Sequence, residues 1–153
     1  MGAMDLHNNV KISRAISPAA AVTDNTAFVS QILDTANFQK NEFAAIFGSI
    51  ADADVTFTVL VEHGDDSGLS DAAAVPDAQL LGLEAGTVTS GAAASGAAPG
   101  FADDNKTTKI GYIGMKRYVR VTITPAANSG NIFCGAVWLQ SGARKSPFTT
   151  QVA

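Results

Sequence analysis

The stretch VTFTVLVE at residues 55–62 alternates apolar with polar side chains, and so does YVRVTIT at residues 118–124. An alternation with a period of two places the apolar side chains on one face of an extended chain. This pattern is typical of a β-strand with one face in the core and the other in solvent. Both stretches are therefore expected to be strands. Pro125 is expected to end the second one, because proline lacks the N–H that a sheet requires.

Four further segments are expected to be strands, because each combines apolar or β-branched residues with turn residues at its ends. They are residues 26–33, 42–50, 107–113 and 132–140. A turn is clearest at residues 63–68, where glycine, aspartate and serine favour tight backbone conformations. Six strands without a convincing long helix favour an all-β fold, an antiparallel β-sandwich or jelly roll.

The strand patterns also assign side chains to the core. Trp138 is expected to face the core, and Cys134 is expected to be a small buried apolar residue. The other residues assigned to the core are Phe57, Val59, Val61, Val119, Val121, Ile123, Val137 and Leu139. None of these side chains is expected to have a direct function.

The chain has 153 residues, a usual size for one domain. Residues 22–140 are expected to form the β-sandwich, with a long Gly/Ala-rich loop at residues 84–105. Residues 1–21 are expected to be an N-terminal arm and residues 141–153 a C-terminal arm, since neither shows a sustained period. No apolar run approaches the roughly 18 residues that span a membrane, and no secretory signal is visible, so a membrane protein is not expected.

Charge is divided along the chain. All fourteen acidic residues lie between Asp5 and Asp104, whereas residues 105–153 contain seven basic residues and no acidic one. Two interpretations remain open: the charges pair within the folded chain, or the acidic part of one copy meets the basic part of another. Nucleic acid is not an expected partner, because the net charge is −4 and the basic segment has few aromatic side chains for stacking on bases.

The sequence offers little for catalysis. Its two histidines, His7 and His63, and its one cysteine, Cys134, are far apart in sequence, and no nucleophile elbow, phosphate-binding loop or zinc-protease motif is present. Three pairs of acidic residues fall at expected turns: Asp52 and Asp54, Asp65 and Asp66, and Asp103 and Asp104. Each pair supplies too few oxygen ligands for calcium, and aspartate at a turn usually bonds to the local backbone. No catalytic residue, metal or cofactor is therefore expected, and the chain is not expected to be an enzyme.

Three segments resemble a known group of proteins. They are HNNVKISRAISPAAAVTDNTAFVSQILDT at residues 7–35, ADADVTFTVLVEHGDDSGLSDAAAV at residues 51–75 and FADDNKTTKIGYIGMKRYVRVTITP at residues 101–125. Together they resemble small proteins encoded among the head genes of tailed bacteriophages and prophages, which by gene neighbourhood look like head decoration, or cement, proteins.

This resemblance implies a structural protein of the virion. It would be assembled in the cytoplasm of the host bacterium, bind the outside of the capsid and stabilise contacts between subunits of the major capsid protein. It would also associate with itself, as a homotrimer around a local threefold axis, without nucleic acid, membrane or cofactor. Many weak contacts would then act together through multivalency.

On this interpretation, residues of both arms and of the basic segment contact the partner. The apolar anchors would be Val10, Ile12, Ile16, Phe148 and Val152, and the basic contacts would be Arg14, Lys116, Arg117, Arg120, Arg144 and Lys145. Two plainer interpretations stay open, disorder of the arms and a solvated hairpin tip at Lys116 and Arg117. The alternative function is a receptor- or glycan-binding head fibre or tail component, with Phe101, Tyr112 and Phe148 as candidate exposed aromatic residues.

Overall fold

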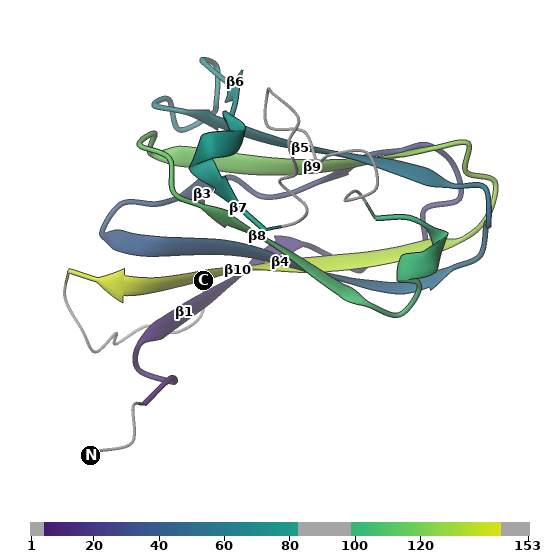
Figure 1. Cartoon of the computed structure of the whole chain (residues 1–153), viewed down its shortest axis with the longest axis horizontal. Coiled ribbons are helices and arrows are strands. Elements are labelled where there is room, and N and C mark those ends of the chain that lie inside the picture. The colour runs from purple at the N-terminus through teal and green to yellow at the C-terminus, as the bar shows by residue number, and fades with distance from the viewer. Residues whose placement is uncertain (1–4, 83–98, 145–153) are drawn as a thin grey trace.

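The protein is an antiparallel β-sandwich, seen in a computed structural model that describes residues 5–82 and 99–144 (Figure 1). The strands are β1 (Val10–Ile16), β2 (Phe28–Val29), β3 (Leu33–Asp34), β4 (Phe38–Ile50), β5 (Thr56–Gly64), β6 (Ala73–Ala74), β7 (Leu80–Leu81), β8 (Thr107–Tyr112), β9 (Tyr118–Ala126) and β10 (Ile132–Ala143). Two 3-10 helices, η1 (Asp77–Gln79) and η3 (Phe101–Asp103), lie in the connections. The prediction of an all-β sandwich is confirmed, whereas the jelly-roll alternative stays a prediction.

Two sheets form the layers of the sandwich, and their strands pair in antiparallel fashion. Sheet A has the strand order β1-β10-β4-β8-β7. Sheet B has the order β2-β9-β5-β6, and β3 pairs with β9 as well. None of the helical segments in the described part of the chain has the length and apolar character to cross a bilayer.

The predicted strand at residues 26–33 is interrupted. It forms β2 and β3, which both pair with β9. Between them, the Ser30 N–H donates to the Val121 carbonyl at 2.9 Å, and the Ser30 hydroxyl oxygen accepts from the Val121 N–H at 2.9 Å. A side chain here takes the place of a backbone acceptor, which breaks the ladder into two short pieces.

Pro125 does not end β9, which continues to Ala126 with Pro125 opposite Phe57 of β5. The N–H of Val121 points away from β5, since it donates to Ser30. Backbone groups alternate in direction along a strand, so the nitrogen of Pro125 also points away from β5. Because β2 pairs with β9 only at Thr122 and Ile123, proline removes no donor that a neighbouring strand uses at this position.

The arm boundaries are wrong at both ends. Residues 10–16, expected in the N-terminal arm, form β1, which pairs with β10 from Val10 opposite Ser141 to Ile16 opposite Ala136. The alternation of VKISRAI is weak because Ile12 and Arg14 both face solvent. At the other end, β10 continues to Ala143. Residues 145–153 of the predicted C-terminal arm and residues 84–98 of the predicted loop lie outside the described residues.

The core lies between the sheets. Its largest side chains include Trp138 and Phe43, whose rings meet edge to face with centroids 5.1 Å apart. The prediction is confirmed for Phe57, Val59, Val61, Val119, Val121, Ile123, Cys134 and Trp138, which are all buried. It is wrong for Val137, which is 37% exposed, and for Leu139, which is half-buried on the outer face. The side chains of β10 alternate, so burial of Trp138 turns both of its neighbours outward.

Candidate interaction surface

The two outer faces of the sandwich differ in chemistry. On sheet B, most outward side chains of β5 and β9 are threonines or charged residues, namely Thr56, Thr58, Glu62, Arg120, Thr122 and Thr124. On sheet A, the outward side chains of β1, β10 and β4 include Ile12, Ala44, Ile46, Val137 and Leu139, which we call the apolar face. Contiguous exposed apolar surface on a sheet usually marks an interaction site.

Strand register makes the apolar face continuous. Ile12 of β1 stands opposite Leu139 of β10, and Val137 of β10 stands opposite Ala44 of β4. Side chains directly opposite one another in antiparallel strands have Cβ atoms about 5 Å apart, so they contact each other. Ile12 is 48% exposed and Ile46 is 58% exposed, so this surface is open to a partner in the isolated chain.

A groove of about 1040 Å³ lies over part of the apolar face. Leu6, Val10, Ile12 and Leu139 contribute apolar walls, and Arg14 and Glu42 contribute charged ones. Farther along β10, Pro18 lies over the sheet at Gly135. A Cβ atom at Gly135 would be only 3.2 Å from the Pro18 side chain. The sequence put Val137 and Leu139 in the core, so it missed these two residues of the surface.

The structure brings together three of the predicted partner-binding residues. Val10, Ile12 and Arg14 all line the groove. Ile16 is only 5% exposed and belongs to the core, so its prediction as an anchor is wrong. A bulge between Arg14 and Ile16 shifts the register, and Ile16 faces inward. Arg144 is exposed after the end of β10, and Lys145, Phe148 and Val152 lie outside the described residues.

The other three predicted basic contacts are paired within the chain. Arg117 donates two hydrogen bonds to Asp34, at 2.9 and 2.8 Å, and Arg120 donates two to Glu62, at 3.1 and 2.7 Å. Lys116 pairs with Asp65. Arg117 also holds the pKa of the Asp34 carboxyl below its ordinary value. Internal pairing, one of the two interpretations left open by the sequence, therefore holds for these cations, and a docking role for them stays a prediction.

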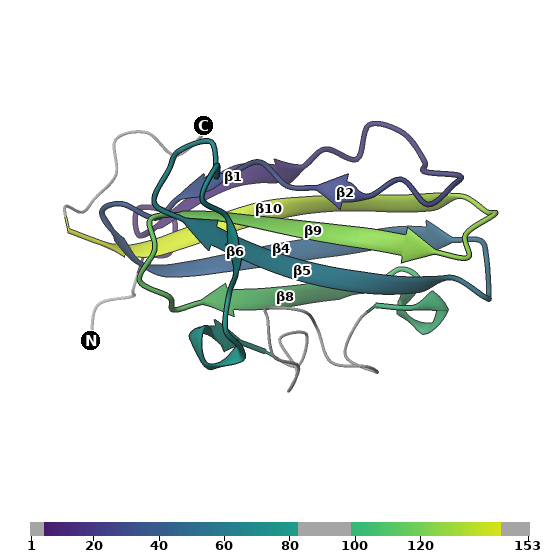
Figure 2. The same ribbon diagram turned by 90° about the horizontal axis from the view of Figure 1, so that it is seen from above.

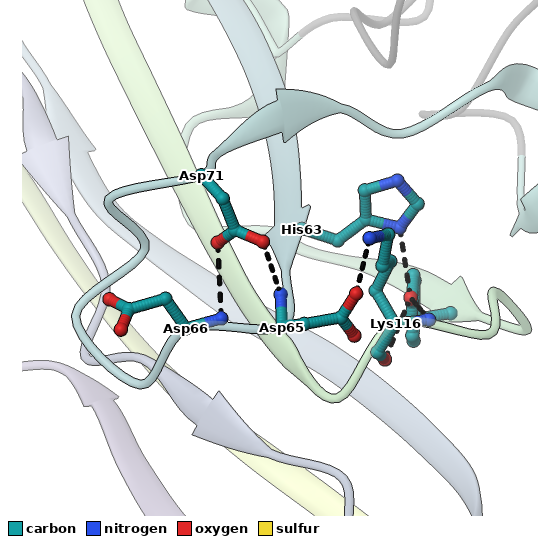
Figure 3. A network of polar contacts seen from close by, with 6 residues as sticks. His63, Asp65, Asp66, Asp71 and Lys116 are labelled. Carbon is teal, nitrogen blue, oxygen red and sulfur yellow. Dashed lines mark hydrogen bonds and ion pairs between the residues drawn. The ribbon is translucent and has the colours of Figure 1, made fainter.

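Most of the acidic side chains at the expected turns accept hydrogen bonds from backbone N–H groups, and Figure 3 shows the turn at residues 65–71. The Asp71 carboxylate accepts from the N–H groups of Asp65 and Asp66, at 2.8 and 3.1 Å, and Asp66 accepts from Gly68 and Ser70. These hydrogen bonds lower the pKa values of both carboxyls, since they favour the charged form. Elsewhere, Asp52 accepts from the N–H groups of Asp54 and Ser129. Within residues 5–82 and 99–144, no group of three or more potential ligands is placed to hold a metal ion.

His63 and Tyr112 form a buried polar pair where β5 approaches β8. The His63 Nδ1 lies 2.9 Å from the Tyr112 hydroxyl, which donates to the Lys116 carbonyl and accepts from the Lys116 N–H, both at 3.1 Å. The single hydroxyl proton is used on Lys116, so we infer that Nδ1 carries a proton and donates it to Tyr112. Tyr112 is thus a structural residue and not the exposed aromatic that the glycan-binding alternative requires.

Protonation of His63 is expected to destabilise the fold. Burial lowers its pKa from the ordinary value of 6.5, Lys116 adds to this effect, and Asp65 and Asp71 oppose it. The unfolded chain then takes up the proton at a higher pH than the folded chain does. The free energy of unfolding should therefore fall as the pH drops below about 6.5, with a slope of at most about 1.4 kcal/mol per pH unit for this one group.

Urea unfolding at about pH 7.5 and pH 5.5 tests this expectation on the wild type and on His63→Gln. The wild-type midpoint should be lower at pH 5.5, and the variant should show a smaller drop. The carboxyls with lowered pKa values lose their contribution mainly below about pH 4, outside this window. Equal pH dependence in the two proteins would assign the effect to other groups.

Cys134 has no reactive character. It is buried in the core, and burial raises the pKa of its thiol to about 12. The thiol therefore stays protonated near neutral pH, whereas a nucleophilic cysteine needs a thiolate.

Comparison of the chain with models of known protein families gives no match, and comparison with curated protein sequences gives none either.

Proposed function

We propose that the chain is a non-enzymatic structural protein of a tailed-phage virion. It binds the outside of the capsid and stabilises contacts between subunits of the major capsid protein. The phage context comes from the sequence resemblance. The observation that carries the binding role is the apolar face on sheet A, with its groove over β1, β10 and β4.

The contrast between the two sheets supports an interaction role. A polar outer face like that of sheet B is what an antiparallel sheet exposed to water normally has. Covering apolar surface contributes about 25 cal/mol per Å² of area removed from water, although part of this is lost to the entropy of association. A modest gain per copy suffices on a capsid, because many copies bind to one assembly and each resists the separation of the subunits beneath it.

Self-association as a homotrimer is part of the proposal and follows from the resemblance. Contacts between the acidic part of one copy and the basic part of the next receive less support, because Lys116, Arg117 and Arg120 already pair within their own chain. Association between copies would instead have to use surfaces other than these ion pairs.

Cosedimentation with capsids that lack the protein tests the proposal. The purified chain should bind to saturation, and binding should weaken only modestly as salt rises from about 50 to 500 mM, since exposed ion pairs are screened but apolar contacts are not. A variant without residues 1–20 would not test the role of the N-terminal segment, because it lacks β1 of sheet A. No binding to any capsid form would overturn the proposal and direct the search to tail assemblies and cell-surface glycans.

A further inference from the structure

Among the described strands that end a sheet, β1 is the longest, and β5 and β8 pair with the two-residue strands β6 and β7 over only part of their length. Of the edge strands, β2, β3, β6 and β7 contain two residues each, whereas β1 contains seven. Figure 2 shows β1 beside β10 at one margin of the sandwich. Short edge strands protect a sheet from unwanted pairing, so a long one offers a template for another strand.

The backbone direction identifies the groups on this edge. In its hydrogen-bonded orientation, the Gln31 side-chain amide donates to the Arg14 carbonyl at 3.2 Å. The backbone carbonyl of Arg14 therefore points away from β10. Because the direction of the backbone N–H and C=O groups alternates along a strand, those of Ile12 and Val10 also point away from β10. Beyond the bulge, the Ala15 carbonyl accepts from the Gln31 N–H at 2.9 Å, which closes that end of the edge. The stretch from Val10 to Ile12 is thus the part that can receive a partner.

The side chains beside this stretch define the chemistry of the partner. Val10 and Ile12 line the groove, so side chains of an added strand on the same face would extend the apolar surface. Arg14 is exposed on that face, and Lys40 also lines the groove. Glu42 lines the groove as well, so the positive charge is local to Arg14 and Lys40, and an acidic side chain opposite Arg14 would complement it.

We propose that β1 binds an extended segment of the major capsid protein by strand addition, with apolar residues of the segment beside Val10 and Ile12 and an acidic residue near Arg14. This inference rests on the proposed function, and it names the part of the partner that the surface recognises. Main-chain hydrogen bonds supply affinity in this mode of binding, and alternate side chains supply specificity.

Ile12→Pro tests the inference, with Ile12→Val as the matched control. Proline removes an N–H that points out of the sheet, and edge strands tolerate proline at such positions, so the free chain should still fold. Binding to capsids that lack the protein should weaken at least about tenfold for Ile12→Pro. Residue 12 of β1 then has no N–H to donate to the added strand, and the proline ring clashes with that strand. The valine variant keeps the N–H and a branched apolar side chain, so its binding should weaken clearly less than that of Ile12→Pro.

Hydrogen exchange on the wild type gives a test that does not depend on the folding of a variant. The protein is exchanged while bound to capsids, then released and read by NMR. The amides of Val10 and Ile12 should exchange quickly in the free chain and gain at least about tenfold protection when bound.

The outcomes separate the two proposals. If the wild type sediments with capsids but these amides gain no protection, or Ile12→Pro folds and binds as well as Ile12→Val, strand addition is wrong and capsid binding stands. If the wild type does not sediment with any capsid form, the proposed function is wrong and strand addition to the capsid protein fails with it.

Discussion

Replacing Trp138 by alanine is expected to lower the free energy of unfolding by about 3–5 kcal/mol, the usual range for truncating a large buried aromatic side chain. The Trp138 side chain is 2% exposed and packs edge to face on Phe43. Its indole N–H donates to the Gln31 carbonyl at 3.1 Å, so truncation also leaves that acceptor without this donor. Domains of this size are stable by only about 5–15 kcal/mol, so the variant should be close to unfolding.

Val137→Ala is the matched control, because it removes apolar atoms from the next residue of the same strand. Val137 is on the apolar face, and its truncation should cost less than about 1 kcal/mol in the isolated chain. Urea unfolding followed by far-ultraviolet circular dichroism compares the two variants, since Trp138 is the only tryptophan and its fluorescence is lost with it. Equal destabilisation by both variants would contradict the observed orientation of β10.

The orientation of β10 shows what a period of two can and cannot determine. In β5 and β9, mostly threonine or charged residues alternate with valine, phenylalanine or isoleucine, so the buried face follows from the sequence alone. In β10, the sequence IFCGAVWLQ has apolar residues on both faces, so periodicity fits either orientation. Packing decides between the two orientations. Trp138 fills the core between the sheets against Phe43, and the smaller Val137 faces outward.

The candidate surface was predictable only in part for a related reason. Val10, Ile12 and Arg14 were expected to contact a partner as members of an arm, and they line the groove as members of β1. A surface made of three strands depends on the register between segments more than a hundred residues apart, as in Ile12 opposite Leu139. Local sequence patterns contain no information on such long-range register.

The ion pairs also depend on the register between strands that are far apart in sequence. Glu62 and Arg120 stand directly opposite each other in β5 and β9, which accounts for their pairing. From composition alone, the separation of acidic and basic residues along the chain fitted both internal pairing and association between copies. The antiparallel pairing of β9 with β5 and β3 brings the two parts of the chain together, so the separation in sequence is not a separation in space.

Replacing Ile46 by aspartate is expected to weaken capsid binding about 100-fold with little effect on the isolated fold. Ile46 is 58% exposed on β4, and the residues directly opposite it in the adjacent strands, Gly135 and Thr107, carry no charge. A carboxylate at this position stays hydrated in the free chain but loses water when a partner covers the apolar face. Burying a charge without a partner costs several kcal/mol. A loss of about 3 kcal/mol in binding free energy is enough to give the expected 100-fold decrease in affinity.

Thr58→Asp is the control for charge, because it places the same side chain at an exposed position of β5 on the outer face of sheet B. Its unfolding free energy and that of Ile46→Asp should both stay within about 1 kcal/mol of the wild type. Cosedimentation should then separate them, with Thr58→Asp binding capsids as the wild type does. Equal weakening would show that added negative charge acts at long range and not at a covered surface, and such an effect would vanish at high salt. Loss of binding by Thr58→Asp alone would instead move the docking surface to sheet B, where the polar face would have to supply hydrogen bonds in place of apolar contact.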